Sequence, residues 1–224
     1  MKKQAKCDGQ ILMDCLAQKT DKLAYERALQ TRGLELIAGV DEVGRGPLAG
    51  PVVCAAVIMP LAAADIIDGV DDSKKLSIKK REALNEQILK KALCVCVCRI
   101  EPDEIDKINI LEATKKCMTQ CVSGLKLRPN AVLVDALKID CGGAECVSII
   151  KGDALSYSIG CASIVAKVYR DKLMDEYAVQ YPDYLFEKNK GYGTSAHINA
   201  IKEKGPCKIH RRSFIKNFWV EKAN

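Results

Sequence analysis

The chain lacks the features that mark several special classes of protein. It contains no run of about 18 consecutive apolar residues, so we expect no membrane-spanning helix. The basic residues near Met1 are followed by no continuous apolar segment, so we expect no cleaved secretory signal. No paired Cys-x-x-Cys motif of the kind used by structural zinc sites is present. With 15 glycines and 7 prolines in 224 residues, the composition also excludes collagen-like and disordered chains.

Cysteine, by contrast, is abundant, with 12 copies. Disulfide scaffolds are normally short secreted chains with a small core, and this chain does not fit that class. Segment 94–98 has cysteine at its first, third and fifth positions, an alternation typical of a strand, and zinc binding there would need further ligands. Cys117 and Cys121 are spaced for one face of a helix. We interpret the cysteines as reduced packing residues of a cytoplasmic protein.

The charge balance is mildly basic. The sequence has 35 Lys and Arg against 29 Asp and Glu, which gives a net charge of +6 with neutral histidines. Such a charge permits an acidic partner such as a nucleic acid, without establishing one. The length fits one sizeable domain, or one domain with a small appendage.

Hydrophobic periodicity predicts an α/β fold. Tightly joined strands early in the chain suggest antiparallel pairing, and the later alternation of strands and helices suggests parallel strands. We therefore expect a mixed β-sheet flanked by helices, with a helical C-terminal extension, in a domain of residues 34–224 that follows an N-terminal helical arm of residues 1–33. Ser77 is a suitable N-cap for one helix. The predicted strands cover 34–41, 50–59, 93–100, 131–135 and 146–151, and the main helices cover 21–31, 78–93, 110–125 and 158–177.

Acidic residues end three of the predicted strands. Asp41 and Glu42 end the apolar strand segment 36–40, Asp135 ends the segment 131–134, and Asp153 ends the segment 147–152, just before a helix. Ligand sites of open α/β sheets gather at strand ends. Carboxylates that meet there repel one another unless they are protonated or neutralised, and oxygen ligands favour hard cations such as Mg²⁺ or Mn²⁺ over zinc. The alternative, that these acids are solvent-facing turn residues, stays open because periodicity does not show whether they converge.

The segment after the first two acids is rich in glycine and proline. Residues 43–51 contain three glycines, two prolines and one arginine. Glycine lets backbone amides approach a ligand closely and tolerates positive φ. Arg45 has the geometry to bind a phosphate through two nitrogens. A structural turn would need some of the glycines but not the arginine, so Gly44-Arg45-Gly46 beside the acids indicates a binding loop.

Several motifs occur in a specific order along about residues 34–215. They are residues 37–52, Asp72-Ser73-Lys74-Lys75-Leu76-Ser77, Asn109-Ile110-Leu111, Val134-Asp135, Lys151-Gly152-Asp153, residues 158–171, Lys190-Gly191-Tyr192-Gly193-Thr194 and His197. In these motifs the sequence closely resembles the bacterial type 2 ribonucleases H, the ribonuclease HII family. The related type 3 enzymes lack the Gly-Arg-Gly loop and carry a larger N-terminal binding domain, so the resemblance favours type 2.

The resemblance implies a ribonuclease H-like fold and an endonuclease that cleaves RNA paired with DNA, including single ribonucleotides embedded in duplex DNA. It implies that two divalent ions, Mn²⁺ or Mg²⁺, hold the scissile phosphate, and that the products carry 3′-hydroxyl and 5′-phosphate ends. The expected partners are RNA–DNA hybrids and ribonucleotide-containing duplexes, with contacts to replication or repair proteins, and we expect a monomer without membrane association. Catalysis and metal binding fall to Asp41, Glu42, Asp135 and Asp153.

The resemblance also implies substrate contacts. Gly44, Arg45 and Gly46 match the loop that contacts the 2′-hydroxyl, the group that separates RNA from DNA, and the adjacent phosphate. Tyr192 matches a tyrosine that stacks on the sugar at the RNA-to-DNA junction; without the resemblance it would be interpreted as a packed aromatic in a glycine turn. The alternative for the lysines is that they are exposed side chains in contact with solvent only. The alternative for Ser163 and Lys167, which are four residues apart on a predicted helix, is that they stabilise that helix. With those alternatives open, the candidates for phosphate or backbone contacts are Lys74, Lys75, Lys151, Ser163 and Lys167.

Some positions depart from the family or lie outside its motifs. Gly160-Cys161 stands where many relatives have two alanines, and Ala136 stands where glycine is common, so we expect small changes of packing and of the approach to the neighbouring acid. The basic, partly aromatic stretch 202–216 fits contact with a duplex backbone, and a solvated helix face is the alternative. We expect His197 and His210 on the surface or at phosphates rather than on a metal.

Three functions compete. The leading hypothesis is a metal-dependent endoribonuclease. A catalytically silent hybrid-binding module of the same fold would have no reason to keep four mutually repelling acids. A proofreading exonuclease or another phosphotransferase on this fold would need differently spaced acids and no Gly-Arg-Gly loop.

Overall fold

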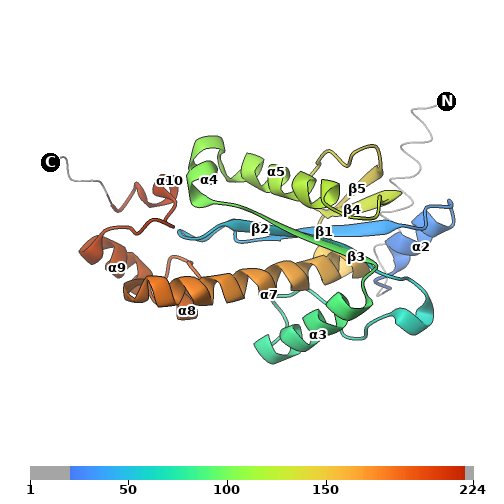
Figure 1. The fold of residues 1–224 in the computed structure, drawn as a ribbon, viewed down its shortest axis with the longest axis horizontal. Coiled ribbons are helices and arrows are strands. Elements are labelled where there is room, and N and C mark those ends of the chain that lie inside the picture. The colour runs from blue at the N-terminus through green and yellow to red at the C-terminus, as the bar shows by residue number, and fades with distance from the viewer. Residues whose placement is uncertain (1–20, 220–224) are drawn as a thin grey trace.

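A computed structural model of the chain describes residues 21–219. Its centre is a five-stranded sheet with the strand order β3-β2-β1-β4-β5 (Figure 1). The strands are β1 Ile37–Val43, β2 Val52–Ile58, β3 Cys94–Ile100, β4 Ala131–Asp135 and β5 Glu145–Ile149. β1, β2 and β3 pair antiparallel, whereas β1, β4 and β5 pair parallel. The predicted mixed sheet, with early antiparallel and late parallel strands, is confirmed.

The central strands are apolar because they are covered on both faces. Every residue of β2 is buried, as are the first four residues of β4. β3 is an edge strand, and its alternating cysteines and valines are mostly half-buried. Asp41, Glu42 and Asp135 are therefore polar exceptions at the carboxyl ends of otherwise apolar central strands.

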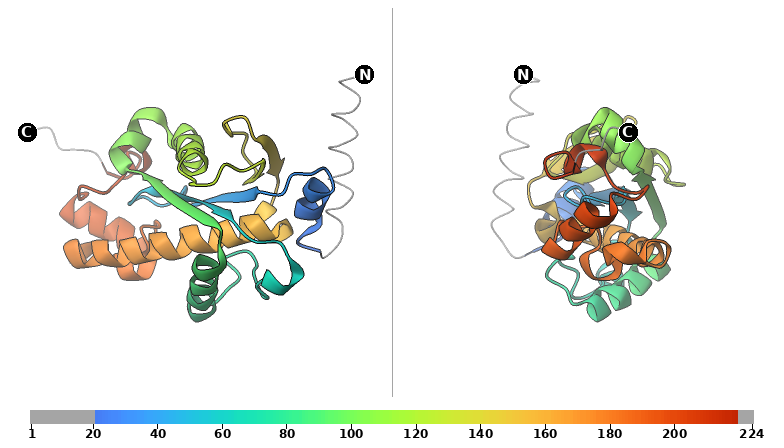
Figure 2. Two further views of the ribbon diagram at one scale, coloured as in Figure 1. Left: turned by 45° about the vertical axis from the view of Figure 1, so that its right-hand side comes forward. Right: turned by 90° about the vertical axis from the view of Figure 1, so that its left-hand side faces the viewer.

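Helices cover both faces of the sheet, as Figure 2 shows from two further sides. The main helices of these two layers are α3 Ile78–Lys91, α5 Ile110–Ser123 and α7 Tyr157–Gln180. α5 covers one face, and α7 with α3 covers the other. At Gly39 of β1, an added Cβ would lie 2.0 Å from the backbone of Ser158 in α7. The absence of a side chain there lets α7 lie directly against the strand that carries Asp41 and Glu42.

Local capping explains where the helices on this sheet begin. Ser77 accepts a hydrogen bond from the backbone amide of Lys80 at the start of α3, which confirms the predicted cap. Asn109 caps α5 through two backbone amides. Asn109 also ends a seven-residue helix, α4 (Pro102–Ile108), that periodicity did not predict. One residue separates α4 from α5, so the two helices have no loop between them that would reveal a boundary in the sequence.

The described part of the predicted N-terminal arm packs onto the sheet. α2 (Ala24–Gln30) lies within the predicted helix 21–31, and its apolar side chains share a buried cluster with residues of β1, β4, β5 and α7. Glu26 accepts a hydrogen bond from Ser156 Oγ at 2.7 Å. Residues 1–20 of the arm lie outside the described residues, and the boundary between 1–33 and 34–224 stays a prediction.

The chain after α7 forms the predicted helical extension (Figure 1). It packs around His197 and His210, which are buried with their Nε2 atoms 3.0 Å apart. The expectation of surface or phosphate-contacting histidines is wrong, because aromatic rings enclose both, and burial, followed by the charge of the neighbouring His197, lowers the pKa of His210 to about 3. The remaining elements are η1 Ala63–Asp65, α6 Gly152–Leu155, η2 Pro182–Tyr184, α8 Phe186–Asn189, α9 Ser195–Lys204 and α10 Arg212–Ile215. Within residues 21–219, every helix is too short or too polar to cross a membrane.

Candidate active site

The carboxyl ends of β1 and β4 bring three acidic side chains together. Val40 pairs with Val134 in the parallel ladder, so Asp41 and Asp135 occupy the next positions of adjacent strands. One carboxylate oxygen from each of Asp41, Glu42 and Asp135 lies within 4.8 Å of the other two. The convergence that periodicity left open is therefore present for these three acids.

Asp153 lies in a helix rather than at the end of a strand. β5 ends four residues before it, so the predicted strand 146–151 is too long at its end. Lys151 turns the chain with φ 59°, and α6 begins at Gly152. The backbone amide of Gly152 donates to Asp135 Oδ1 at 2.7 Å, which ties the turn to the end of β4. Asp153 is thus carried to the edge of the acid group by a turn that strand periodicity did not reveal.

The four predicted acids share a strongly negative environment. Burial and then the charges of Glu42 and Asp135 raise the pKa of Asp41 well above its ordinary value. Burial is also the main cause that raises the pKa of Glu42, Asp135 and Asp153. Lys74 Nζ lies 3.9 Å from Asp153 Oδ2, and its positive charge partly opposes the shifts of Asp135 and Asp153. The ionised forms of these acids therefore need more positive charge than this lysine supplies.

The donor set fits a hard divalent cation. The converging ligand atoms of Asp41, Glu42 and Asp135 are all carboxylate oxygens, the donors that Mg²⁺ and Mn²⁺ prefer. Among the described residues, Glu42 Oε2 is buried without a hydrogen-bond partner. A buried polar atom in that state is costly unless a water or an ion satisfies it. A bound cation would supply this partner and reduce the repulsion between the acids, so the residues present fit the metal.

The Gly-Arg-Gly loop borders a cleft of about 380 Å³ beside the acids. Gly44 has φ 91°, and an added Cβ there would lie 2.3 Å from Arg170 Nε, so only glycine fits this position. Arg45 Nη1 lies 3.4 Å from Glu42 Oε1, which links the loop to the acids. The predicted site residues that line the cleft are Glu42, Gly44, Arg45, Gly46, Lys74, Ser163, Lys167 and Tyr192.

Tyr192 borders the loop with an accessible ring. The ring lies next to Gly46, at 3.8 Å from where a Cβ would stand, and the side chain is 43% exposed. This exposure disfavours the alternative of a packed core aromatic and leaves the ring available to a ligand.

Two of the predicted lysines lie away from this cleft. Lys75 Nζ lies 3.8 Å from Asp71 Oδ1, and Lys75 lines a neighbouring cleft together with Lys22 and Tyr157. Lys151 is exposed at the turn before α6. Among residues 21–219, the lining of the cleft beside the acids includes neither lysine. Their phosphate contacts stay predictions.

Two fully buried arginines, which the sequence alone did not assign to the site, hold the loops around the cleft. Arg211 donates hydrogen bonds to the carbonyls of Gly44 (2.6 Å), Arg45 (2.9 Å) and Gly50 (3.0 Å). Arg170 donates to the carbonyls of Lys190 (2.9 Å), Ala49 (3.1 Å) and Pro51 (3.1 Å). Arg211 belongs to the basic stretch predicted to contact a duplex; for this residue the prediction is wrong, because its guanidinium is occupied by backbone carbonyls inside the protein.

Further polar residues fix the side chains on the α7 wall of the cleft. Ser73 Oγ and Ser163 Oγ lie 2.9 Å apart. Lys167 Nζ lies 2.6 Å from Asp171 Oδ1, and Asp171 also binds Arg81 Nη1 at 3.0 Å. Burial lowers the pKa of Lys167, and the bond to Asp171 opposes that shift. Ser73 and Asp171 lie inside the motifs quoted above, whereas Arg81 lies outside them and carries no sequence signal.

The departure at Ala136 has a conformational consequence. Ala136 has φ 54°, in the left-handed region that favours glycine, directly after Asp135. Its amide donates to the carbonyl of Ile149 at 2.9 Å, which fixes this conformation. A side chain at this position therefore strains the turn that follows a predicted catalytic acid.

Sequence comparison identifies the relatives of this chain. A sequence model of the family described as Ribonuclease HII matches residues 38–219. The chain is 52% identical over 196 residues to ribonuclease HII of Ruminiclostridium cellulolyticum, which covers 88% of this chain and 76% of the relative. It is 50% identical over 202 residues to ribonuclease HII of Caldicellulosiruptor bescii, which covers 90% of this chain and 97% of the relative.

Solved structures of such proteins share the fold. A PCNA:RNase HII complex from Archaeoglobus fulgidus matches with a TM-score of 0.70 at 27% identity, over 83% of this chain and 98% of that chain. The ribonuclease H2 of Pyrococcus horikoshii matches with a TM-score of 0.66 at 28% identity, over 79% of this chain and 92% of that chain. The predicted ribonuclease H-like fold is confirmed. The chain therefore belongs to the ribonuclease HII family and is a ribonuclease H, a nuclease that depends on divalent metal ions.

Proposed function

We propose that this chain is an endoribonuclease that cleaves the RNA strand of RNA–DNA hybrids and single ribonucleotides embedded in duplex DNA. The observation that carries the proposal is the group formed by Asp41, Glu42 and Asp135 next to a cleft lined by the Gly-Arg-Gly loop and Tyr192. The acids provide donors for hard cations, and the loop provides close backbone contact for a sugar. The products would carry 3′-hydroxyl and 5′-phosphate ends.

The proposed ligands of two divalent ions, Mg²⁺ or Mn²⁺, are Asp41, Glu42, Asp135 and Asp153. When bound, the ions would activate the attacking water and stabilise the departing oxygen. Asp41 is the most buried of the central acids and feels the charges of both Glu42 and Asp135, which supports its role as a ligand that would help to hold the ions. Asp153, whose carboxylate lies beside Lys74, would supply a further ligand to the second ion.

Recognition of the ribonucleotide falls to Gly44, Arg45 and Gly46 in this proposal. The 2′-hydroxyl is both a donor and an acceptor, so backbone groups placed against it distinguish RNA from DNA. The Arg45 side chain is 42% exposed, and its contact to Glu42 is long, at 3.4 Å, so it is free to turn toward a phosphate. The exposed ring of Tyr192 supports its proposed stacking on the sugar.

The remaining proposed contacts are to the backbone of the duplex. Lys74, Ser163 and Lys167 line the cleft and are placed for phosphates that enter it. Lys75 and Lys151 lie outside the cleft, and we retain them as contacts to more distant phosphates. We include in the proposal a monomer that acts in the cytoplasm. The PCNA complex formed by the Archaeoglobus relative supports contact with a replication protein.

Cleavage of a duplex that contains one ribonucleotide tests this function. The labelled duplex is incubated with Mg²⁺, with Mn²⁺ or with a chelator, beside an all-DNA duplex of the same sequence. We expect one cut on the 5′ side of the ribonucleotide with either metal, and an intact duplex with chelator. Cutting of both duplexes at similar rates would contradict ribonucleotide recognition. Binding of the hybrid without any cutting would identify the silent binding module instead.

A further inference from the structure

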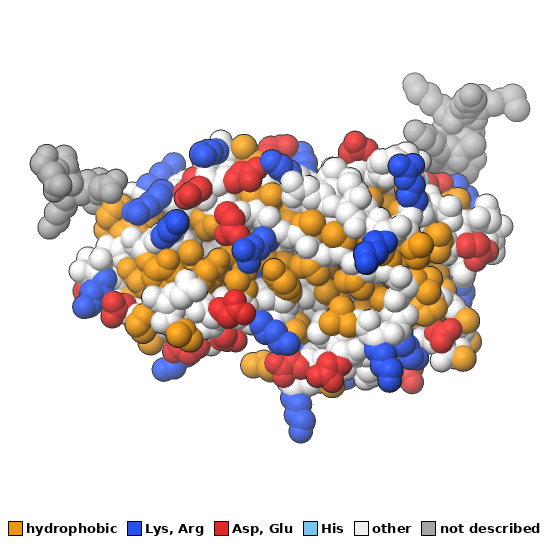
Figure 3. Space-filling view, viewed as in Figure 1, with side chains coloured by type: hydrophobic (Ala, Val, Ile, Leu, Met, Phe, Trp, Pro, Cys, Tyr) orange, Lys and Arg blue, Asp and Glu red, His pale blue; other side chains and the backbone are white. Residues whose placement is uncertain are grey.

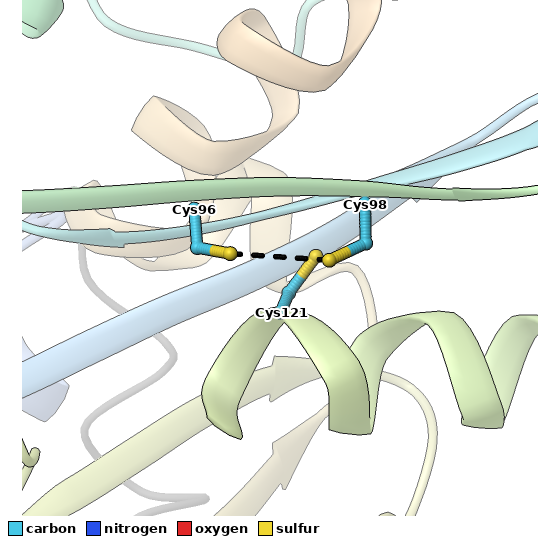
Figure 4. Close-up of side chains that lie close together, drawn as sticks. All are labelled: Cys96, Cys98 and Cys121. Atoms are coloured by element: carbon cyan, nitrogen blue, oxygen red, sulfur yellow. Dashed lines mark hydrogen bonds between the residues drawn. The ribbon is translucent and has the colours of Figure 1, made fainter. Parts of the chain in front are cut away.

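Three thiols converge at a distance from the acids. Cys96 and Cys98 come from β3 and Cys121 from α5, and their Sγ atoms all lie within 4.8 Å of one another (Figure 4). The Sγ atoms of Cys96 and Cys98 are 3.9 Å apart. We call these residues the thiol cluster. The proposed function uses none of them.

The fold brings the thiol cluster together through two periodicities. Cys96 and Cys98 are two residues apart on a strand and therefore share one face, and α5 packs on that face. Gly124, just after α5, leaves room for the first thiol, because a Cβ there would lie 2.6 Å from Cys96 Sγ. The protonated Cys121 thiol donates to the carbonyl oxygen of Cys54 at 3.1 Å, and this bond is given up when the thiol loses its proton to bind a cation.

The spacing of the sulfurs fits a metal better than a covalent bond. A tetrahedral cation with metal–sulfur bonds of about 2.3 Å has sulfur–sulfur edges of about 3.8 Å, close to the separation of Cys96 and Cys98. A disulfide joins only two sulfurs and would leave the third thiol of the cluster outside the bond. Residues two apart on a strand also have Cα atoms about 6.6 Å apart, near the upper limit for a disulfide.

We propose that Cys96, Cys98 and Cys121 bind one thiophilic divalent cation of the Zn²⁺ class. Soft thiolate donors select such ions and reject Mg²⁺, so this site and the carboxylate site would take different metals. Binding releases the thiol protons to solvent, and three thiolates with a divalent cation leave a net charge of −1. A monovalent cation such as Cu⁺ would leave −2, which a half-buried site tolerates less well.

The thiol cluster is accessible from solvent. β3 is the edge strand of the sheet, and Cys96 and Cys98 are half-buried, whereas Cys121 is buried. β3 crosses the front of the molecule in Figure 1, and Figure 3 shows side chains of the hydrophobic class, which includes cysteine, along the middle of the same face. A cation can therefore reach the thiol cluster from this face, where Cys96 and Cys98 are half-buried and Cys121 is the buried third ligand.

Cadmium titration of the full, reduced and chelator-treated chain tests the proposal. Cd²⁺ is added without oxygen and with excess Mg²⁺, and thiolate-to-cadmium charge-transfer absorption in the ultraviolet is followed, because only sulfur ligands produce it. We expect saturation at one equivalent per chain and loss of the signal when Zn²⁺ is added in competition. Cys98→Ser should abolish the saturable signal, and Cys121→Ser should do the same.

Cys146→Ser is the matched control, because Cys146 is exposed and lies outside the thiol cluster. It should leave the titration unchanged. Far-ultraviolet circular dichroism of each variant confirms folding; Cys98 is half-buried, so its variant keeps the test valid if the buried Cys121 variant unfolds. A signal that survives in folded Cys98→Ser, or none in the wild type, would overturn the proposal. The proposal would also be overturned if the chain lost the mass of two hydrogens in air, which indicates a disulfide, and failed to bind Cd²⁺ under reducing conditions.

Discussion

Replacement of Arg211 by lysine tests how the Gly-Arg-Gly loop is held. The wild-type guanidinium is buried and donates to three loop carbonyls, those of Gly44, Arg45 and Gly50. Burial and the neighbouring Arg170 lower its pKa to about 9, so it remains charged at neutral pH. Lysine keeps the charge but loses the planar fork, and its single ammonium does not reach three carbonyls arranged around a guanidinium.

The expected cost follows from these three bonds. A hydrogen bond from a charged donor contributes about 1.5–3 kcal/mol, so the loss of two amounts to about 3–6 kcal/mol. Water that enters the site recovers part of this, and we expect the free energy of unfolding to fall by about 3 kcal/mol. The free energy of unfolding of a typical domain is about 5–15 kcal/mol, so we expect the variant to stay folded. The loop loses its anchor at Gly44 and Arg45, and a displacement near 1 Å lowers cleavage by about 100-fold.

Urea unfolding and kcat/KM on the single-ribonucleotide duplex measure the two effects. Arg212→Lys is the matched control, because Arg212 is exposed and directly follows Arg211 in the chain, and we expect the free energy of unfolding of this variant to change by less than about 0.5 kcal/mol. If Arg211→Lys matched the wild type in both stability and cleavage, the proposed anchoring of the loop would be refuted.

Three further predictions concern the acids and their neighbours. In metal-free protein at pH 8, Asp41→Asn should raise the free energy of unfolding by about 0.5–2 kcal/mol, because burial disfavours the ionised form. Since the raised pKa means that protonation stabilises the wild type, this gain, measured by urea unfolding, should shrink as the pH falls. Ala136→Gly should stabilise by about 0.5–1 kcal/mol, since relief of the left-handed alanine outweighs the added chain entropy; a lower Tm would contradict this. Arg45→Ala should reduce single-ribonucleotide cleavage more than all-DNA duplex binding measured by fluorescence anisotropy, and equal losses would show a simple charge contact.

Most of the fold could be predicted because its local signals are strong. The apolar run 131–135 gives β4 with the same bounds, and Ser77 caps α3 as expected. Acids at the ends of β1 and β4 converge because these strands are parallel neighbours, which the chain order suggests but periodicity does not show. The predicted placement of Asp153 at a strand end is wrong, because Lys151 adopts a left-handed conformation that carries no sequence signal.

The buried polar residues and the thiol cluster could not be predicted for a different reason. A charged residue in a basic stretch is normally exposed, so Arg211 gave no sign that it is buried among carbonyls. The prediction of surface positions for His197 and His210 is wrong because a polar side chain is exposed by default, and the burial of these two depends on how the C-terminal extension packs. Cys121 is more than twenty residues from Cys96 and Cys98, so their convergence depends on the packing of α5 on β3 and not on motif spacing. Among residues 21–219, the interpretation of the cysteines as packing residues fits the buried ones outside the thiol cluster, and the thiol cluster is where the structure adds to it.

The cleavage activity of Asp135→Asn tests the catalytic role of the acid group most directly. The variant keeps the shape of the side chain but removes one charge from the acid group, and its folding is checked by circular dichroism. Metal stabilisation of the reaction contributes several kcal/mol, and about 1.4 kcal/mol is a factor of ten, so we predict a loss of about a thousandfold with Mn²⁺ on the single-ribonucleotide duplex. Asp140→Asn, at an exposed acid beyond the site, should cleave as the wild type does. Cleavage at the wild-type rate by folded Asp135→Asn would contradict the assignment of the acid group as the catalytic metal site.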